Sequence, residues 1–355
     1  MAQHAGLSAR LFEAGQPFVA AQLQHPTVKA LEAGQLPDAQ ARSWLEQDYL
    51  FLQQEIGVLT RLAWQAPPGQ QEELLRLAWN VVAEAGDADA ERTVVFIAHH
   101  DAAHSGLIFH PILPRIPLKV APRLHARSNR SFPLLYAVWL GPVLVCAGSV
   151  LGARRVLAAG GAIAAAATAA MIDIGARAPV PGANDNLSAV GAIVALAERL
   201  RDRPVEGVRV LLVSTGSEES FSEGMQGFGH RHFSELDPER TEMVCLECVG
   251  GPTLIVVEGE GMLRMRDYPA EMREALDEAA AAARIPIVRG LRTTAATDAI
   301  IALRAGYPVA TLASVDETKL PMNYHWPNDV PDALHWDTIE DAVGVCEQFL
   351  RTRVR

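Results

Sequence analysis

From Asn80 onward, short apolar runs alternate with amphipathic segments of helical periodicity. The runs are rich in β-branched residues and end at polar or glycine residues, which is typical of strands buried on both faces. This alternation predicts an α/β fold of the three-layer α/β/α type, with a mostly parallel central sheet. The predicted strands are Thr93–Ala98, Val208–Ser214, Glu242–Glu247, Thr253–Val257 and Pro308–Leu312, and the predicted helices are Leu187–Leu200, Ala270–Ala282 and Thr338–Leu350.

The first 79 residues have a different character and are expected to be all helical. Apolar residues such as Leu50, Ile56 and Leu59 recur at helical spacing, and nothing in this stretch indicates a strand. The sequence therefore predicts a helical segment over residues 1–79 and an α/β domain over residues 80–355.

Composition narrows the classes of function. The chain of 355 residues has a formal net charge of −11, which argues against nucleic acid as the main partner because phosphate binding needs a basic face. Its first residues lack a basic stretch followed by an apolar one, so no cleavable signal is expected and the chain is placed in the cytoplasm or at a membrane. The four cysteines are too few and too scattered for a disulfide framework, and Cys245 and Cys248 are expected to be core residues.

One segment departs from the α/β pattern. Leu134–Leu151 and Val156–Ile172 carry no charge, and the pair Arg154–Arg155 lies between them. Each stretch is close to the length that spans a bilayer, so one interpretation is a helical hairpin, over about 131–177, that enters or crosses a membrane. The other is a buried helix pair or a subunit interface in a homo-oligomer. Basic residues flank the hairpin on both sides, so its orientation stays open.

Polar residues of metal-binding type follow the predicted strands. His99 and Asp101 end the first strand and, being two residues apart, can share a face. A metal-bound histidine usually donates its second ring N–H to a carboxylate, and Asp101 is placed for that role. A single His-x-Asp is weak evidence by itself.

Three further acidic elements occur at similar places. Asp185 lies in a turn-rich loop, Pro181–Asn186, where a carboxylate can bridge two cations, although an ordinary Asx turn would look the same. Glu218 and Glu219 directly follow a strand, so one can bind metal while the other acts as a general base, or both can belong to a solvated turn. Glu247 ends an apolar run and needs a partner there, because an unpaired buried carboxylate is costly.

The fifth element is Tyr324-His325, after the last strand, whereas His110 and His335 are interpreted as surface or packing residues. Parallel strands bring such residues together at their carboxyl ends. Nitrogen and oxygen donors without a thiolate suit zinc in an open catalytic site.

With these motifs in place, residues 80–355 resemble the co-catalytic zinc aminopeptidases, family twenty-eight of the metallopeptidases, whose relatives include glutamate carboxypeptidase and glutaminyl cyclase. The matching stretches are NVVAE, VVFIAHHDAAHSG, PGANDNLSAVGAIVALAE, VLLVSTGSEES, CLECVGG, TDAIIALRAGYPVATL and YHWPND. Two departures are Glu247, where many relatives carry Asp, and the apolar insertion, which is larger than in the usual enzymes.

The resemblance implies two Zn²⁺ ions that share Asp185. It assigns His99 and Glu247 to the first ion and Glu219 and His325 to the second. It also implies roles for four other residues: Glu218 as general base and acid, Asp101 as the orienter of His99, Tyr324 as a stabiliser of the oxyanion and Asp298 in support.

A second resemblance concerns the N-terminal segment. HPTVKALEAGQLPDAQARSWLEQDYLFL is similar to the opening helices of the thiaminase-II (TenA-like) family, with Asp48 at the position of that family's acidic residue. The chain changes to the peptidase pattern before the nucleophilic Cys and catalytic Glu of that family could appear. Asp48 is therefore interpreted as a structural remnant.

The predicted function is hydrolysis of the peptide bond next to a free N-terminus. Two alternatives remain: a single-zinc acyltransferase of the glutaminyl cyclase type, and a membrane-associated relative without activity.

Overall fold

The computed structural model describes residues 80–353. Contacts within the chain divide it into two units, Met1–Trp79 and Asn80–Arg355. The predictions of an all-helical start and of a remnant role for Asp48 lie outside the described residues.

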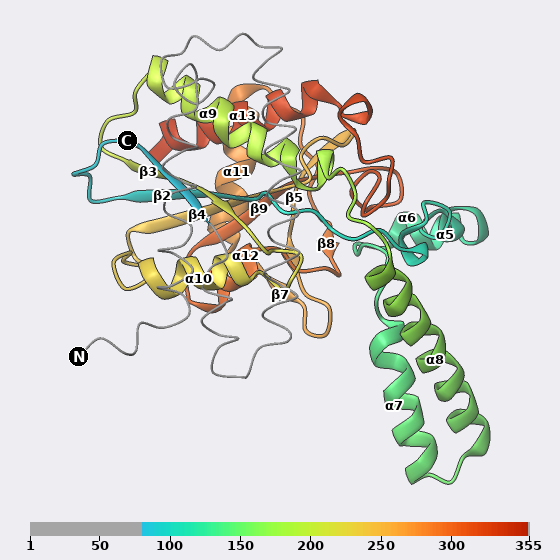
Figure 1. Ribbon diagram of the computed structural model, residues 1–355. Coiled ribbons are helices and arrows are strands. Elements are labelled where there is room, and N and C mark those ends of the chain that lie inside the picture. Colours follow the sequence, from blue (N-terminus) through green and yellow to red (C-terminus); the bar gives the residue numbers. More distant parts are fainter. Residues whose placement is uncertain (1–79, 354–355) are drawn as a thin grey trace, which may run out of the picture. The chain divides into compact units, whose positions relative to one another are not determined.

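A six-stranded sheet forms the centre of the second unit, in the order β1-β3-β2-β4-β9-β5 (Figure 1). The four inner strands β3, β2, β4 and β9 run parallel, while β1 and β5 pair antiparallel at the two edges. The expected mostly parallel α/β sheet is confirmed. The strands are β1 (Val81–Gly86), β2 (Thr93–His99), β3 (Arg209–Thr215), β4 (Thr241–Glu247), β5 (Thr253–Val256) and β9 (Val309–Val315).

Helices cover both faces of this sheet, which makes the three layers of the fold (Figure 1). The helices α9, α11 and α13 pack on one face, and the shorter α10 and α12 lie on the other. All seven residues of β2 are buried as a result, which explains its continuous apolar sequence. The helices are α9 (Ser188–Asp202), α10 (Glu223–His232), α11 (Ala270–Ala283), α12 (Ala299–Arg304) and α13 (Trp336–Arg353).

The edge strand β1 is absent from the sequence-based predictions. Five of its six residues are exposed, so its sequence shows neither the continuous apolar run of a buried strand nor a clear alternation. Register, not composition, defines it: Val81 to Gly86 pair with Ser214 to Arg209 of β3.

A large insertion separates β2 from α9. It begins with short turns and helices and continues as two long antiparallel helices that extend away from the sheet (Figure 1). The predicted hairpin is thus present as a pair of helices, joined at Leu151–Ala153. The insertion contains the 3₁₀ turn Leu107–Phe109, α5 (Arg115–Val120), α6 (Pro122–Arg127), α7 (Ala137–Val150) and α8 (Arg154–Ala176).

The remaining elements surround the carboxyl edge of the sheet. A small three-stranded sheet has the order β7-β6-β8. Its strands and the remaining turns are β6 (Gly259–Glu260), β7 (Arg266–Asp267), β8 (Arg292–Thr293), the π-type turn Ala183–Leu187 and the 3₁₀ turn Pro331–Ala333.

Candidate metal centre

Five of the predicted site residues lie together at the carboxyl edge of the main sheet. With Glu218, they form three overlapping groups, and within each group the potential ligand atoms lie within 4.8 Å of one another. Two of these groups share Asp185. They are His99, Asp185 and Glu247, and Asp185, Glu219 and His325.

His99 is the last residue of β2, and its ring is buried. Its Nδ1 lies 3.1 Å from the backbone carbonyl of Asp101 and 3.4 Å from the Asp101 carboxylate. A hydrogen on Nδ1 satisfies this carbonyl and leaves the lone pair of Nε2 free. That nitrogen faces Asp185 Oδ1 at 3.3 Å and Glu247 Oε1 at 3.5 Å.

The second oxygen of Asp185 faces the opposite histidine. Oδ2 lies 3.2 Å from His325 Nε2, and the same nitrogen lies 3.4 Å from Glu219 Oε1. A single buried carboxylate therefore stands between two imidazoles, with one oxygen directed to each.

These separations fit ligands of zinc. Two donors bound to one tetrahedral zinc at about 2.0–2.1 Å lie about 3.3 Å apart. The four distances between imidazole nitrogens and carboxylate oxygens run from 3.2 to 3.5 Å. The donor atoms are thus spaced as ligands around two neighbouring positions.

The buried atoms of the site that lack a hydrogen-bond partner also fit metal ligands. Buried polar atoms usually have a partner, but His99 Nε2, Asp185 Oδ2 and Glu247 Oε2 have no hydrogen-bond partner. All three belong to the two groups that share Asp185. Buried nitrogen and oxygen atoms with free lone pairs, placed among carboxylates, are typically satisfied by a bound cation.

The charges of the site act strongly on one another. Burial lowers the pKa of His325, but the carboxylates of Glu219 and Asp185 outweigh it and raise that pKa to about 10. Burial raises the pKa of Asp185, but its contacts with His325 and His99 hold that pKa below the ordinary value. The histidines and carboxylates of the site thus favour each other's charged forms.

Glu218 stands beside both groups. Its Oε2 lies 4.0 Å from His99 Nε2, and burial raises the pKa of its carboxyl well above the ordinary value. The carboxylate of Asp101 accepts the backbone N–H groups of Glu218 at 3.0 Å and Glu219 at 3.1 Å. Asp101 therefore positions the Glu218–Glu219 turn as well as His99.

Asp329 is a site residue that the sequence analysis did not identify. Its two oxygens accept the backbone N–H groups of Asn184 at 2.7 Å and Asp185 at 3.0 Å, and the residue is fully buried. Burial raises its pKa to about 7. Asp329 ends the matching stretch YHWPND, which was the available signal, but its role could not be recognised because it acts on the backbone of a distant loop.

The neighbours of Asp185 fix the same loop. The side chain of Asn186 donates to the carbonyl of Leu246 at 3.0 Å and accepts the N–H of Cys248 at 2.8 Å. The side chain of Asn184 accepts the N–H of Gly250 at 2.8 Å. These bonds tie the loop to the end of β4, next to Glu247.

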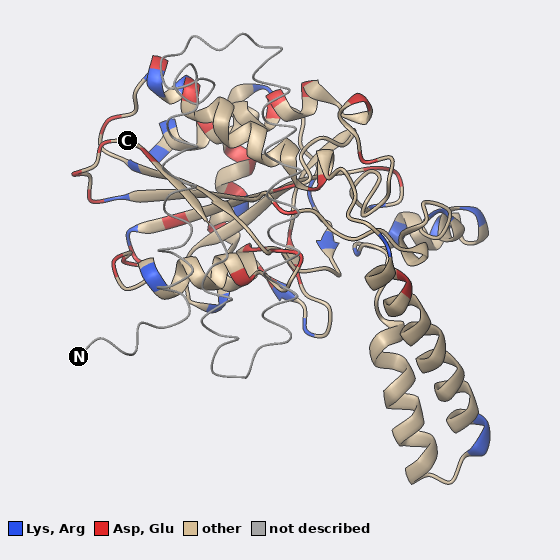
Figure 2. Ribbon diagram, viewed as in Figure 1, with Lys and Arg blue, Asp and Glu red and all other residues tan. Residues whose placement is uncertain are grey.

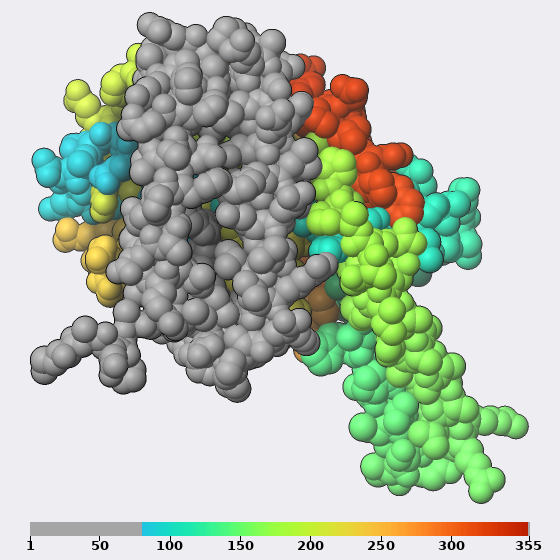
Figure 3. All heavy atoms as spheres, in the orientation of Figure 1, coloured from blue at the N-terminus to red at the C-terminus, as the bar shows by residue number. Residues whose placement is uncertain are grey.

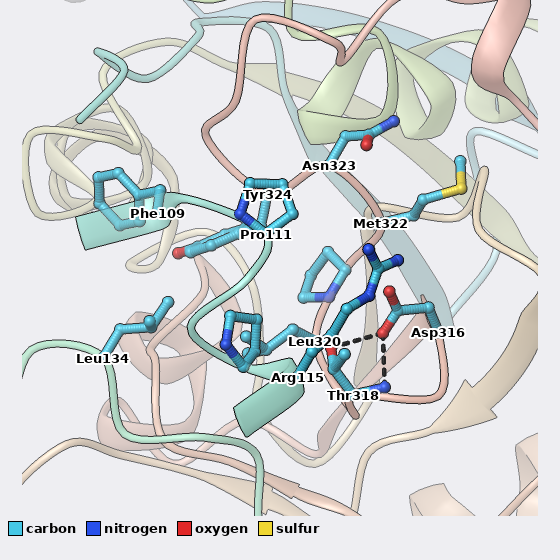
Figure 4. Close-up of a pocket in the computed structure, with 12 residues that line it drawn as sticks. Phe109, Pro111, Arg115, Leu134, Asp316, Thr318, Leu320, Met322, Asn323 and Tyr324 are labelled. Atoms are coloured by element: carbon cyan, nitrogen blue, oxygen red, sulfur yellow. Dashed lines mark hydrogen bonds between the residues drawn. The ribbon is translucent and has the colours of Figure 1, made fainter. Parts of the chain in front are cut away.

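Tyr324 lies beside the second group of donors. Its ring stacks on His325 with the centroids 3.9 Å apart, and Phe109 packs edge-on against both rings. Burial raises the pKa of the Tyr324 hydroxyl well above its ordinary value. Figure 4 shows Tyr324 and Phe109 in the wall of a pocket of about 60 Å³, between the insertion and the loop that precedes His325.

Asp298 lies behind the site, where it accepts a hydrogen bond from Thr215, and burial raises its pKa to about 7. His110 packs on Trp326, and neither it nor His335 belongs to a potential metal-binding group among residues 80–353. Cys245 and Cys248 are buried and unpaired, as expected of core residues.

A mostly parallel sheet with imidazole and carboxylate groups gathered at its carboxyl edge defines an α/β protein with a candidate metal centre. The sequence profile of peptidase family M28 matches residues 168–350, and the chain belongs to this family. The profile of the TENA/THI-4/PQQC family matches residues 14–84, in agreement with the resemblance of the N-terminal segment. That match extends into β1, which belongs to the peptidase sheet.

Several solved structures are similar to this chain at low identity. A zinc aminopeptidase from Bacillus subtilis is 16% identical, with a TM-score of 0.45 over 77% of this chain and 50% of its own. A leucine aminopeptidase precursor from Bacteroides thetaiotaomicron is 13% identical, with a TM-score of 0.47 over 76% and 75% of the two chains. A glutaminyl cyclase from the same organism is 14% identical, with a TM-score of 0.48 over 77% of each.

The chain spans about half the length of the Bacillus subtilis enzyme that it matches. None of the curated proteins matches it.

Proposed function

We propose that this protein is a zinc aminopeptidase that uses two Zn²⁺ ions to hydrolyse the peptide bond after a free N-terminal residue. The observation that carries the proposal is the placement of Asp185, whose two oxygens face His99 at 3.3 Å and His325 at 3.2 Å. Glu247 would complete the ligands on the His99 side, and Glu219 those on the His325 side.

Bound zinc supplies Lewis acidity, which polarises the scissile carbonyl and makes a water molecule a stronger nucleophile at neutral pH. Glu218 would accept the proton of the attacking water and return it to the leaving amine. Burial raises the pKa of this carboxyl above its ordinary value, which makes the carboxylate a stronger base for the first transfer.

Two other residues support this step. Asp101 positions Glu218 through its backbone N–H, so the base stays fixed relative to His99. The Tyr324 hydroxyl, on a ring stacked against His325, would donate a hydrogen bond to the oxygen that becomes negative in the transition state.

The substrate in this proposal is a peptide with a free N-terminus. Its α-ammonium group would be bound by acidic groups of the site, which is surrounded by carboxylates. The same donors would also support a single-zinc enzyme that cyclises N-terminal glutamine, and the two functions differ in metal content and product.

The test combines zinc analysis of the purified full chain with a panel of aminoacyl amides and glutaminyl peptides. Two zinc ions per chain and release of free amino acids are expected. One zinc, with cyclised glutaminyl product and no hydrolysis, would establish the cyclase function instead. Binding of zinc without turnover of any substrate would leave the non-catalytic relative as the correct description.

A further inference from the structure

The insertion between β2 and α9 differs in charge from the rest of the chain. No Asp or Glu occurs between Ala102 and Ile172, whereas the whole chain has a net charge of −11. The same stretch contains seven basic residues, and Figure 2 shows them at the two ends of the insertion. They are Arg115, Lys119, Arg123, Arg127 and Arg130 near the sheet and Arg154 and Arg155 at the far turn.

The helices between these basic groups are apolar and exposed. Only 11% of the most apolar window of α8 is buried, so α8 is not a core helix. In Figure 3 the atoms of α7 and α8 form an arm that extends away from the other described residues of its unit. Val143 and Ile172 have 61% and 68% of their surface exposed.

The two helices are packed closely on each other. An added Cβ at Gly141 would lie 2.6 Å from Ala164 N, and one at Gly148 would lie 2.5 Å from Leu157 N. Small residues thus bring the backbones together and turn the larger apolar side chains outward. Helices that associate within lipid pack in this way.

The length of α8 agrees with a bilayer: its 23 residues extend about 34 Å, and the hydrocarbon layer of a bilayer is about 30 Å thick. The 14 residues of α7 extend about 21 Å, and the whole uncharged stretch Leu134–Leu151 would extend about 27 Å as a helix. The pair Arg154–Arg155 lies at one end of α8 and the ion pair of Asp173 with Arg177 at the other. Tyr136 and Trp139, at the sheet end of α7, are residue types that favour the lipid–water interface.

Hydrogen bonds hold the base of the arm. Asp173 of α8 accepts the N–H of Leu107, at the start of the same insertion, at 2.7 Å, and the indole N–H of Trp139 donates to Met262 Sδ of the peptidase domain at 3.1 Å. Lys319 donates to the carbonyls of His125 and Ser128, each at 2.6 Å. The arm is therefore oriented relative to the domain.

We propose that α7 and α8 cross a lipid bilayer as a hairpin, with α5 and α6 bound to anionic headgroups on the near side and Arg154–Arg155 among the headgroups of the far side. The near side has the larger excess of Lys and Arg, which places the peptidase domain on the cytoplasmic face. The occupant of the exposed apolar surface is lipid, and basic α5–α6 complements an anionic leaflet.

The first test is flotation of the full chain, diluted from mild detergent, with vesicles of phosphatidylcholine and phosphatidylglycerol. The protein should float with the vesicles and remain with them after alkaline carbonate extraction. Protein that stays at the bottom of the gradient, or that carbonate releases, would overturn the crossing.

A matched pair of variants tests the arm itself. Val143→Glu places a carboxylate in the proposed lipid-facing surface of α7. Val194→Glu is the control: it places a carboxylate on α9, in the peptidase domain, at a residue with a similar exposed fraction of 55%. Partition into vesicles should fall about 100-fold for Val143→Glu and stay unchanged for Val194→Glu. Because both positions are exposed in the folded protein, both variants should keep their cooperative unfolding and their zinc content.

If Val143→Glu instead dissociates a dimer that exists without lipid, the exposed surface is a contact between two copies and the proposal is wrong.

The native Cys146 gives an independent measurement, because it is exposed on α7 whereas the other three cysteines are buried. A charged maleimide should label Cys146 in the absence of lipid and fail to label it after insertion. Equal labelling in both states would contradict insertion of α7.

The basic helices are tested by the combined change Lys119→Ala, Arg123→Ala and Arg127→Ala. Binding to vesicles with phosphatidylglycerol should weaken about fivefold per charge removed. Binding to pure phosphatidylcholine should not change. An equal effect on both kinds of vesicle would rule out recognition of anionic headgroups by α5 and α6.

Discussion

The carboxylate of Asp329 accepts the backbone N–H of Asp185 at 3.0 Å. The residue that faces both histidines is therefore held by a second acid whose own side chain faces no potential metal position. Groups that orient metal ligands in this way typically contribute 10–100-fold to metal affinity.

Replacement of Asp329 by Asn should lower zinc affinity by about 10–100-fold, because one of the two N–H groups at Asn184 and Asp185 loses its acceptor. Competition with a chromogenic chelator measures this affinity. Asp332→Asn, an exposed acid three residues away, is the control and should leave it unchanged. Equal affinities for wild type and Asp329→Asn would show that the loop keeps its shape without this acid.

The two potential metal-binding groups that share Asp185 lead to a prediction about the number of zinc ions bound. Asp185→Ala should lose both ions, because Asp185 is common to both groups, whereas Glu247→Ala and Glu219→Ala should each lose one. Elemental analysis of dialysed protein gives the count. Exposed Glu271, changed to Ala, provides the control. Loss of both ions from Glu219→Ala alone would indicate one site, or two sites that fill only together.

Removal of the proposed base should separate binding from turnover. Glu218→Gln keeps the size of the side chain but cannot accept a proton, so turnover should fall by about 10²–10⁴-fold while two zinc ions remain bound. Steady-state hydrolysis of an aminoacyl amide, with zinc measured on the same sample, checks both parts. Glu198→Gln, on the exposed side of α9, should behave as wild type. Undiminished turnover by Glu218→Gln would remove this residue from the mechanism.

The burial of Glu260 leads us to expect that the stability of the folded protein depends on pH. Its carboxyl is fully buried in β6, its Oε2 accepts the N–H of Thr297 at 2.7 Å, and burial raises its pKa from 4.5 to about 8. Between these two values the folded protein binds a proton that the unfolded chain does not. The free energy of unfolding should therefore fall as pH rises through this window, by up to about 1.4 kcal/mol per pH unit from this group.

Glu260→Gln removes this titration, so the stability of the variant relative to wild type should increase steadily from about pH 5 to about pH 8. Urea unfolding of both zinc-loaded proteins across this range measures the difference. The exposed acid Glu274, changed to Gln, should show no such trend. A constant difference at all pH values would mean that Glu260 titrates normally in the folded protein.

The sequence predicted the inner strands because burial on both faces demands continuous apolar runs, as in β2. It predicted the meeting of His99 and Glu247 because parallel strands end at a common edge, whereas Asp185 lies in a loop before α9 and was placed there by the motif. Their roles as zinc ligands, and those of Glu218 and Tyr324, stay predictions.

Other features depend on tertiary contacts that no local pattern contains. Strand β1 is exposed and defined by its pairing with β3. Helices α5 and α6 have six residues each; α5 contains Pro117 and α6 begins at Pro122. Asp329 acts on backbone N–H groups 144 and 145 residues away, so only the folded chain brings them together.

The insertion leaves the sheet directly after Asp101 and returns directly before the loop of Asp185, so both of its ends are joined to the candidate catalytic machinery. Anchoring such an arm would confine the enzyme's search for substrate to a plane. Chain ends emerging at the surface of that plane would be encountered far more often than peptides diffusing in the surrounding volume. Selectivity could then arise from where a substrate is, as much as from which residue it begins with.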